Sequence, residues 1–449
     1  MEITNITFDN RDEYNRQPIA EKVINLLSND IDISPLVING DWGTGKTEFC
    51  HKLVNMFREV NTHHVVYIDA FKADHANEPL LTVLAEIVKI LPDNDQKSSL
   101  KRKIIPALKF GIKTISKAAV AHVLRQDATE ALDQFDQELQ EIADKSIDAT
   151  AKALFNEHLE SEKNIKALQE ILSGIAEEKP MAIFIDELDR CRPNFAVDIL
   201  ELIKHTFDLD NVNFILVTNF EQLKASINHS YGQSINANRY LDKFIKFTIS
   251  LPKYIEDQNR ESAAVSSKHF LGLINNSTVL SNSRLNLEGF QYFSNHIFQA
   301  HDATLREVET FIRNLEIYQV LNDNRAFTST TGYGSALLRG LAVAIHTFNP
   351  ILASSILDDK LDARDLAEFL AISRDILLNS RESRPEDYEI IYAYLAKDCR
   401  FNAHHLLSAQ EQQGWNELFL QVFQGGSYIL PTFNRTSSLK SVLQTLNLG

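Results

Sequence analysis

Eight consecutive residues near the N-terminus have the spacing of a phosphate-binding loop, G-x-x-x-x-G-K-T. They are Gly40, Asp41, Trp42, Gly43, Thr44, Gly45, Lys46 and Thr47. Glycine lets the backbone turn so that successive N–H groups point at one anion. The Lys46 ammonium adds a charge for phosphate oxygens, and the Thr47 hydroxyl can bind Mg²⁺. This loop, extended by Glu48, therefore predicts a site for a nucleoside triphosphate and Mg²⁺.

Two adjacent carboxylates, Asp186 and Glu187, follow the apolar run at residues 181–185. Such a run is typical of a strand buried on both faces of a parallel sheet, and ligands bind at the carboxyl ends of such strands. We expect Asp186 to hold Mg²⁺ and Glu187 to polarise the water that attacks the terminal phosphate. The alternative is a loop acid pair that caps the next helix. The phosphate-binding loop favours the catalytic interpretation.

Arg190 and Asn219 each have two interpretations. Arg190 can supply positive charge to the transition state, in its own subunit or in a neighbour's, or it can pair with Asp189 to hold the loop. Asn219 follows the apolar run at 214–217 and can orient the attacking water or simply form a turn. No Asn-Lys-x-Asp element occurs, so the side-chain pair that selects guanine is absent. Adenine is favoured by elimination.

These side chains require strands that end close to the loop. Apolar and β-branched runs predict strands at 35–39, 64–68, 181–185, 214–217 and 244–251. Helical periodicity at 17–29, after the loop and at 79–91 alternates with these strands. The alternation predicts a doubly wound α/β domain of the P-loop NTPase class with a mostly parallel sheet, which Pro252 ends.

Beyond residue 252 we predict an all-helical C-terminal region. Helical patterns occur around 260–274, 287–299, 303–322, 334–346, 362–378, 387–397 and 412–424, and turn-rich patches lie at 275–284, 323–332 and 425–437. We divide the chain into an ATPase core at 1–252, a helical subdomain at 253–325 that packs on this core, and a partner-binding region at 326–449.

Residues 97–175 are predicted to form a helical insertion in the core. Residues 97–117 contain seven Lys and Arg residues and no acid, whereas residues 127–148 contain eight acids and one lysine. A basic amphipathic helix can bind nucleic acid or lie on an anionic membrane surface. The alternative, which we favour, is that the basic and acidic helices pair as a hairpin.

The composition of the whole chain excludes several protein classes. A length of 449 residues indicates two or three domains, and a net charge of −16 argues against a wholly basic nucleic-acid binder. The three cysteines lack metal-ligand spacing and fit a reduced environment. The chain has no apolar signal-peptide core at residues 1–16 and no uncharged run of about 18 apolar residues. We therefore expect a cytoplasmic protein without a membrane-spanning segment.

Four separated stretches resemble the KAP family of P-loop NTPases. They are the loop at 40–47 and the stretches 67–72, 184–191 and 239–244, in this order, and the resemblance covers about residues 10–320. It implies ATP binding and hydrolysis with Lys46, Thr47, Asp186 and Glu187 as the core of the site. It also makes Arg306, at the start of a predicted helix, a candidate to contact the γ-phosphate.

The chain departs from the family pattern at three places. The family usually has Asp where Glu187 stands and Trp where Phe71 stands. Many members carry membrane-spanning helices where this chain has its amphipathic insertion. The departure at the insertion puts membrane anchoring in doubt and leaves only peripheral membrane contact as an option.

Two functions are compatible with these features. The first is an ATPase whose hydrolysis drives a conformational change, as a switch or an assembly motor; bacterial relatives of this kind are often parts of anti-phage defence systems. The second is a nucleotide-dependent scaffold with negligible turnover. In either case we expect a homo-oligomer or a protein complex formed through the helical C-terminal region. The presence of Glu187 favours the first function.

Overall fold

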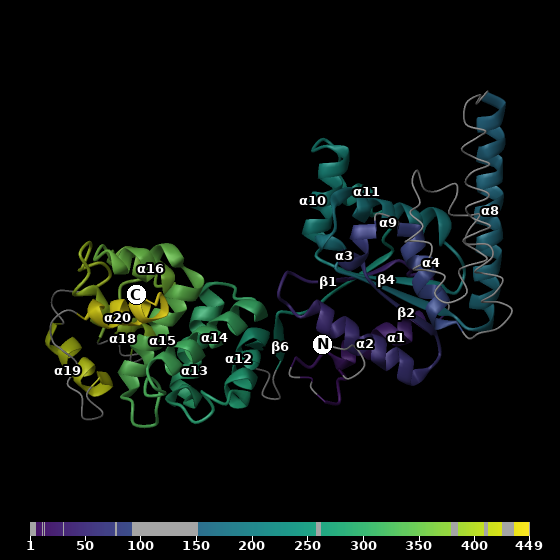
Figure 1. Ribbon diagram of the computed structural model, residues 1–449. Helices are drawn as coiled ribbons and strands as arrows, with labels where there is room; N and C mark the ends of the chain where they lie inside the picture. Colours follow the sequence, from purple (N-terminus) through teal and green to yellow (C-terminus); the bar gives the residue numbers. More distant parts are fainter. Residues whose placement is uncertain are drawn as a thin grey trace. The chain divides into compact units, whose positions relative to one another are not determined.

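The chain forms two compact units, residues 1–251 and 252–449, which we call the N-terminal and C-terminal units (Figure 1). The computed structural model describes residues 6–10, 12, 14–29, 31–76, 79–91, 151–256, 262–378, 385–407, 412–423 and 435–448. Within these residues the N-terminal unit contains a parallel sheet and the C-terminal unit consists mainly of helices.

The N-terminal unit is built on a five-stranded sheet with the order β2-β3-β4-β1-β5. All neighbouring strands are parallel. The strands are β1 (Leu36–Asn39), β2 (His64–Asp69), β3 (Met181–Asp186), β4 (Val212–Thr218) and β5 (Phe247–Ser250). The five strands predicted from apolar runs are confirmed, with bounds shifted by up to three residues.

Helices cover both faces of this sheet, since the side chains of a buried strand alternate between its two faces. Ala182 and Phe184 of β3 pack with the side chains of α1 (Gln17–Leu27) and α2 (Lys46–Val60). Ile183 and Ile185 pack in a second core on the opposite face. That core is covered by α4 (Pro79–Ile90), α8 (Ala151–Glu178), α9 (Pro193–Thr206) and α10 (Phe220–Tyr231). Two short helices, α3 (Ala70–Ala73) and α11 (Ala237–Leu241), complete the unit.

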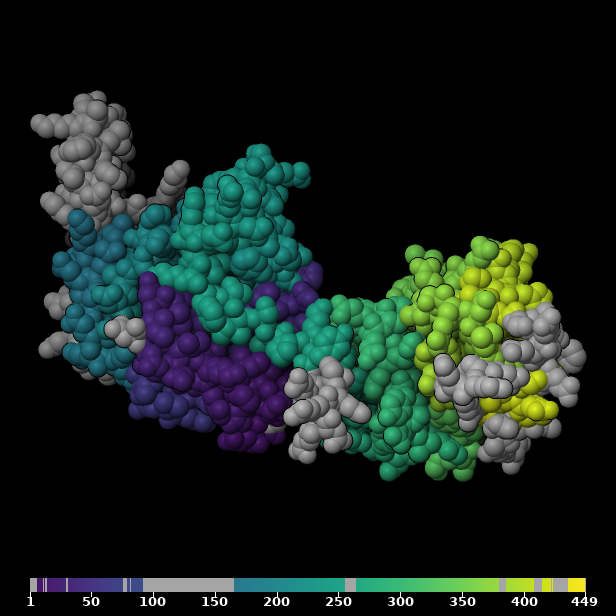
Figure 2. All heavy atoms as spheres, turned by 180° about the vertical axis from the view of Figure 1, so that it is seen from behind, coloured from purple at the N-terminus to yellow at the C-terminus, as the bar shows by residue number. Residues whose placement is uncertain are grey.

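The N-terminal segment lies directly against the later strands of the sheet. β1 pairs with β4 on one side and with β5 on the other. At the surface seen in Figure 2, from behind, purple N-terminal residues lie beside teal ones. The strand that precedes the phosphate-binding loop is therefore an inner strand of the sheet, next to the edge strand β5.

Part of the predicted insertion belongs to the core of the N-terminal unit. Leu168, Leu172 and Ile175 of α8 are buried in the same cluster as α4 and β3. The apolar positions of this last part of α8 therefore support the sheet. The basic stretch 97–117, the acidic stretch 127–148 and their predicted hairpin lie outside the described residues. In the part that the structure describes, no helix is both long and apolar enough to cross a membrane.

The C-terminal unit begins with a small antiparallel pair of strands, so the expected all-helical region is mostly helical. The strands are β6 (Tyr254–Glu256) and β7 (Ser262–Ala264). Nine helices follow in the described residues. They are α12 (Val265–Asn276), α13 (Glu288–Ala300), α14 (Leu305–Leu321), α15 (Tyr333–Phe348), α16 (Pro350–Leu357), α17 (Ala363–Phe369), α18 (Asp387–Ala396), α19 (Gln412–Phe423) and α20 (Thr436–Leu446).

One hydrophobic core runs through the C-terminal unit, from Phe270 to Leu443. It includes residues from both sides of position 325, so the packing shows no boundary there. The helix predicted at 362–378 ends at Phe369 because Ala371 has a left-handed backbone with φ 52°. α16 and α20 were not predicted, and α20 begins inside the patch interpreted as turn-rich.

Candidate nucleotide-binding site

Three strands of the N-terminal unit carry the candidate site at their carboxyl ends. The loop follows β1, the two carboxylates lie at the end of β3, and Asn219 follows β4. Asn39 pairs in register with Thr218, and Asp69 with Asp186. The strand ends therefore meet at one edge of the sheet, where ligands of open α/β folds bind.

The phosphate-binding loop has the backbone that its glycines permit. Gly43 and Gly45 have left-handed φ angles of 76° and 79°, which side chains other than glycine rarely adopt. A side chain at Gly40 would place its Cβ 2.7 Å from the Thr44 Oγ1. The Thr44 N–H and hydroxyl both donate to the Asp41 carbonyl, at 3.3 and 2.8 Å. The result is a tight turn before the N-terminus of α2, a geometry suited to anions.

Lys46 lies over this turn with its ammonium group bonded to the loop itself. Its Nζ donates to the carbonyl oxygens of Gly40 at 2.7 Å and Asp41 at 3.0 Å. Burial lowers the pKa of Lys46, and the carboxylates of Asp189 and Asp186 act in the opposite direction. A bound phosphate must compete with two carbonyl groups for this ammonium group.

Thr47 and Asp186 form the corner expected to hold Mg²⁺. Asp186 is only 1% exposed, and its carboxylate accepts a hydrogen bond from the Glu187 N–H at 2.8 Å. Burial, and next the nearby Glu187 carboxylate, raise the pKa of Asp186 to about 7. A dication beside Asp186 would favour its charged form. A hydroxyl and a buried carboxylate are hard oxygen donors, so this corner fits Mg²⁺.

This donor set is small, as expected for Mg²⁺, which keeps several of its waters. Among the described residues no group of three or more His, Cys, Asp or Glu side chains could hold a metal ion. The corner therefore suits a metal that is shared with phosphate oxygens better than a metal held by protein ligands alone.

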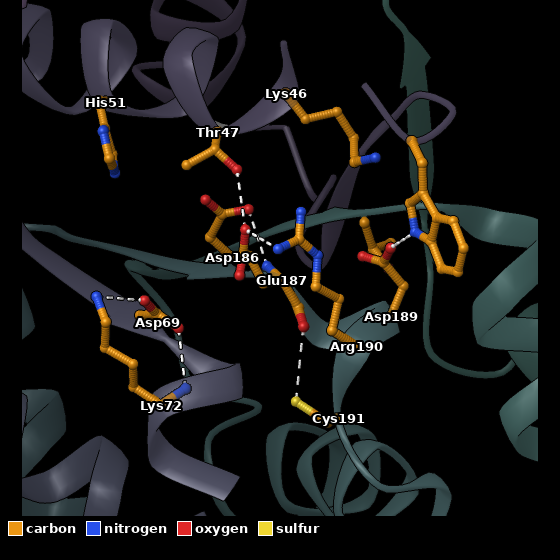
Figure 3. A network of polar contacts seen from close by, with 12 residues as sticks. Lys46, Thr47, His51, Asp69, Lys72, Asp186, Glu187, Asp189, Arg190 and Cys191 are labelled. Atoms are coloured by element: carbon orange, nitrogen blue, oxygen red, sulfur yellow. Dashed lines mark hydrogen bonds and ion pairs between the residues drawn. The ribbon is translucent and has the colours of Figure 1, made fainter. Parts of the chain in front are cut away.

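Glu187 lies beside this corner in a strained backbone conformation. Its φ is 61°, in the left-handed region, where a residue with a side chain costs about 1–2 kcal/mol. Its Oε1 lies 3.5 Å from the Thr47 Oγ1 and 3.0 Å from the Arg190 Nη1. Of the two interpretations of Arg190, the one that pairs it with Asp189 has the wrong partner, since Arg190 pairs with Glu187. Figure 3 shows the Arg190 side chain between Glu187 and Asp189.

Asp189 instead ties the loop to the end of β4. One carboxylate oxygen accepts the indole N–H of Trp42 at 2.7 Å, and the other accepts the Thr218 hydroxyl at 3.2 Å (Figure 3 draws the first bond). Both Asp189 and Thr218 are buried. Asp189 thus joins three segments of the site that are far apart in the sequence.

Asn219, Glu48 and Arg306 have other contacts. The Asn219 Oδ1 caps α10 by accepting the backbone N–H groups of Glu221 and Gln222. If Asn219 orients the attacking water, it must therefore do so through its amide nitrogen. Glu48 forms an ion pair with Lys52 at 2.8 Å. Arg306 lies in the first turn of α14 in the C-terminal unit, so the N-terminal unit does not itself supply it to the loop.

Three further contacts of the site were not predicted. The Tyr67 hydroxyl donates to the Asp186 Oδ2 at 3.3 Å, and the His51 Nε2 lies 3.0 Å from the same hydroxyl. Burial raises the pKa of Tyr67, so the phenol stays protonated and can donate. The Arg16 guanidinium donates to the Thr44 carbonyl of the loop at 2.8 Å. No local pattern in the sequence indicates these contacts, although Tyr67 lies in a stretch that resembles the family.

Comparisons with known proteins give one family assignment. None of the curated proteins matches the chain. The crystal structure of Cdc6p from Pyrobaculum aerophilum is 12% identical, with 97% of this chain and 94% of that chain covered and a TM-score of 0.40, too low to support an argument. The model of the KAP family P-loop domain matches residues 16–322, more than half of the chain. The chain therefore belongs to the KAP family of P-loop NTPases.

Proposed function

We propose that this protein hydrolyses ATP with Mg²⁺ and uses the cycle as a conformational switch or assembly motor. The observation that carries the proposal is the position of Glu187. It directly follows the buried Asp186, and its carboxylate lies 3.5 Å from the hydroxyl of Thr47. A carboxylate beside the metal corner is suited to accept a proton from a water that attacks the γ-phosphate.

The other residues bind and orient. The backbone N–H groups of the loop and the start of α2 cradle the phosphates, and Lys46 exchanges its two loop carbonyls for phosphate oxygens. Thr47 and Asp186 hold Mg²⁺. When bound, Mg²⁺ supplies positive charge to the β- and γ-phosphate oxygens. Adenine is proposed because the element that selects guanine is absent from the sequence.

Glu187 can accept a proton from water only after its ion pair with Arg190 opens. Their ion pair at 3.0 Å occupies the carboxylate oxygen that also faces Thr47. Once released, the Arg190 guanidinium is free to face charge that develops on the phosphate. This exchange would couple the state of the nucleotide to the conformation of the loop that follows β3.

The decisive experiment compares phosphate release by the wild type and by Glu187→Gln. The substitution keeps the size of the side chain and removes the base, so we expect turnover to fall about 100-fold or more with little change in ATP affinity. Glu221→Gln, an exposed residue on α10 paired with Lys224, is the matched control and should keep full turnover. Equal phosphate release by wild type and Glu187→Gln in every condition would reject the proposal that the protein is an ATPase.

The ion pair between Glu187 and Arg190 also favours a second candidate, a nucleotide-dependent scaffold. If this pair stays closed, ATP binds and is not turned over. The scaffold predicts that ATP changes the molar mass of the protein in solution while phosphate release stays at background. Light scattering of wild type and Glu187→Gln, each with ATP, separates the two functions. If the protein is an ATPase, the assembly lasts longer in the variant than in wild type; if it is a scaffold, the two assemblies last equally long.

The setting of this activity is proposed from features of the sequence and from the family resemblance. We place the protein in the cytoplasm, in an oligomer or complex formed through residues 326–449, and in bacterial anti-phage defence. A plaque assay with host cells that express wild type or Lys46→Ala tests the defence role. Equal plaque numbers in the two strains would reject it.

DNA binding through residues 97–117 is tested by the dependence of the binding affinity on salt concentration, which a helix that contacts phosphates must show.

A further inference from the structure

Arg16 is a buried arginine that the catalytic proposal does not use. It directly precedes α1, and only 3% of its surface is exposed. Its Nη1 donates to the backbone carbonyl of Thr44, 28 positions later, at 2.8 Å. Its Nε has no hydrogen-bond partner in the described residues. The bond to Thr44 therefore dominates the orientation of a charged group that is costly to bury.

The segment around Arg16 is itself well fixed. The carboxylate of Asp12 accepts the backbone N–H groups of Arg16 and Gln17, each at 2.9 Å. The Arg16 guanidinium lies 5.0 Å from the centre of the buried Tyr14 ring. Burial lowers the pKa of Arg16, and Tyr14, Glu48 and Asp12 counteract it, so the guanidinium stays charged. Arg16 thus offers the loop a rigid donor from outside the loop.

The bond to Thr44 determines where the next N–H group points. A trans peptide is planar, and its C=O and N–H bonds point in opposite directions. Since Arg16 holds the Thr44 oxygen on one side, the Gly45 N–H must face the other side. Gly45 has a left-handed backbone, and without a side chain its flanking peptides can rotate easily. A contact that fixes the Thr44–Gly45 peptide therefore fixes the direction of the Gly45 N–H.

The Asp41–Trp42 peptide, earlier in the loop, is held by the loop's own groups. The Asp41 carbonyl accepts Thr44 N–H, Thr44 Oγ1 and Lys46 Nζ. The Lys46 contact has to break when the lysine moves to a phosphate, whereas the Arg16 contact does not involve a phosphate-binding side chain. Arg16 can therefore keep the Thr44–Gly45 peptide in place throughout a nucleotide cycle.

We infer that Arg16 is a positioning residue that pre-sets the Gly45 N–H toward the bound phosphates. The inference rests on the proposed nucleotide binding. Backbone N–H groups of such loops contact the α- and β-phosphates, so Arg16 should strengthen ADP and ATP binding equally. A sensor of the γ-phosphate would act on ATP alone. A purely structural anchor would change thermal stability and leave both affinities unchanged.

The test measures the Kd of ADP and of ATP by isothermal titration calorimetry for the full chain. Arg16→Met keeps the aliphatic volume and removes the donors, and we expect both Kd values to rise by about tenfold or more. Arg16→Lys keeps the charge and one donor group without the planar fork, so its Kd values should lie between, at least about threefold above wild type. Arg58→Ala, an exposed arginine at the end of α2, is the control and should bind like wild type.

Each outcome decides the inference. Folded Arg16→Met with both Kd values within twofold of wild type would overturn it, as would a loss confined to ATP. If Arg16→Met does not fold, Arg16→Lys decides alone, and a wild-type Kd for ADP in that variant rejects the role. A wild type that binds neither nucleotide ends the proposed function and this inference together. A wild type that binds both with no effect of Arg16 ends only the inference.

Discussion

The two units of the molecule differ in the charges that they bury. Among the described residues, the N-terminal unit buries Arg16, Lys52, Asp74, Asp186 and Asp189. In the described part of the C-terminal unit the only buried Asp, Glu, Lys or Arg is Glu389, which completes the capping box of α18. Buried charge costs free energy unless it is paired, so it persists where it has a task.

The difference separates a unit built for a charged ligand from a unit built for packing. Buried charges of the N-terminal unit hold the loop, the β3 end and the β4 end against each other. In the C-terminal unit several polar side chains serve helix ends. His301 and His296 contact the carbonyl oxygens of Phe369 and Leu370, where α17 ends. The first unit should therefore respond to nucleotide and the second to changes in packing.

The largest effect should come from Phe270→Ala in the C-terminal unit. Phe270 is fully buried, with ring contacts to Phe290, Phe298 and Phe311. We expect a loss of about 3–5 kcal/mol in the stability of that unit, and an ADP affinity within twofold of wild type. Chemical denaturation followed by circular dichroism, together with calorimetric titration, measures both. Tyr292→Ala, at an exposed site on α13, is the control. Weaker ADP binding by Phe270→Ala would contradict the inference that nucleotide binding does not depend on packing in the C-terminal unit.

Asp186→Asn should stabilise the N-terminal unit when EDTA removes metal. The folded-state pKa of Asp186 is raised from 3.8 to about 7, so the proton is held more tightly in the folded state and stability falls as pH rises toward 7. At about 1.4 kcal/mol per unit, asparagine should gain roughly 4 kcal/mol at pH 8. The gain should grow between about pH 4 and pH 7 and then level off. Thermal melts across this range measure it, and a gain independent of pH would contradict the assignment.

Lys46→Ala should weaken ATP binding about 100-fold, which corresponds to about 2.7 kcal/mol. The lysine donates to two carbonyl groups of its own loop, so thermal stability should change little. Calorimetric titration and a thermal melt of the same sample measure the two quantities. The control is Lys204→Ala on α9, whose lysine forms an ion pair with Asp208. Loss of stability without loss of affinity would assign Lys46 to packing.

The smallest effect should come from Tyr67→Phe. The variant removes the hydroxyl that donates to the Asp186 Oδ2 and keeps the ring. A neutral hydrogen bond is worth about 1 kcal/mol, so the Mg²⁺ concentration for half-maximal ATP binding should rise roughly three- to tenfold. Tyr292→Phe is the matched control at an exposed position. If the Mg²⁺ requirement is the same for Tyr67→Phe and wild type, Tyr67 does not orient the metal ligand.

The sheet and the loop could be predicted because each is encoded locally. A fully apolar run such as 181–185 has few alternatives to a buried strand, and the loop requires its glycines at fixed spacing. α20 was missed although Leu439, Val442, Leu443 and Leu446 have helical spacing, because its Ser and Thr residues are weak helix formers and resemble those of the preceding turn-rich patch. Contacts such as Arg16 with Thr44 and Tyr67 with Asp186 join distant positions, and no local pattern encodes them.

The positions of the two tryptophans give the protein an optical property. The chain has two tryptophans, one in each unit. Trp42 is 49% exposed on the phosphate-binding loop, whereas Trp415 is 1% exposed and stacks on Phe419. Their indoles should emit at different wavelengths, the half-exposed one further to the red. The natural fluorescence of this protein can therefore follow the loop and the helical unit separately, without any added dye.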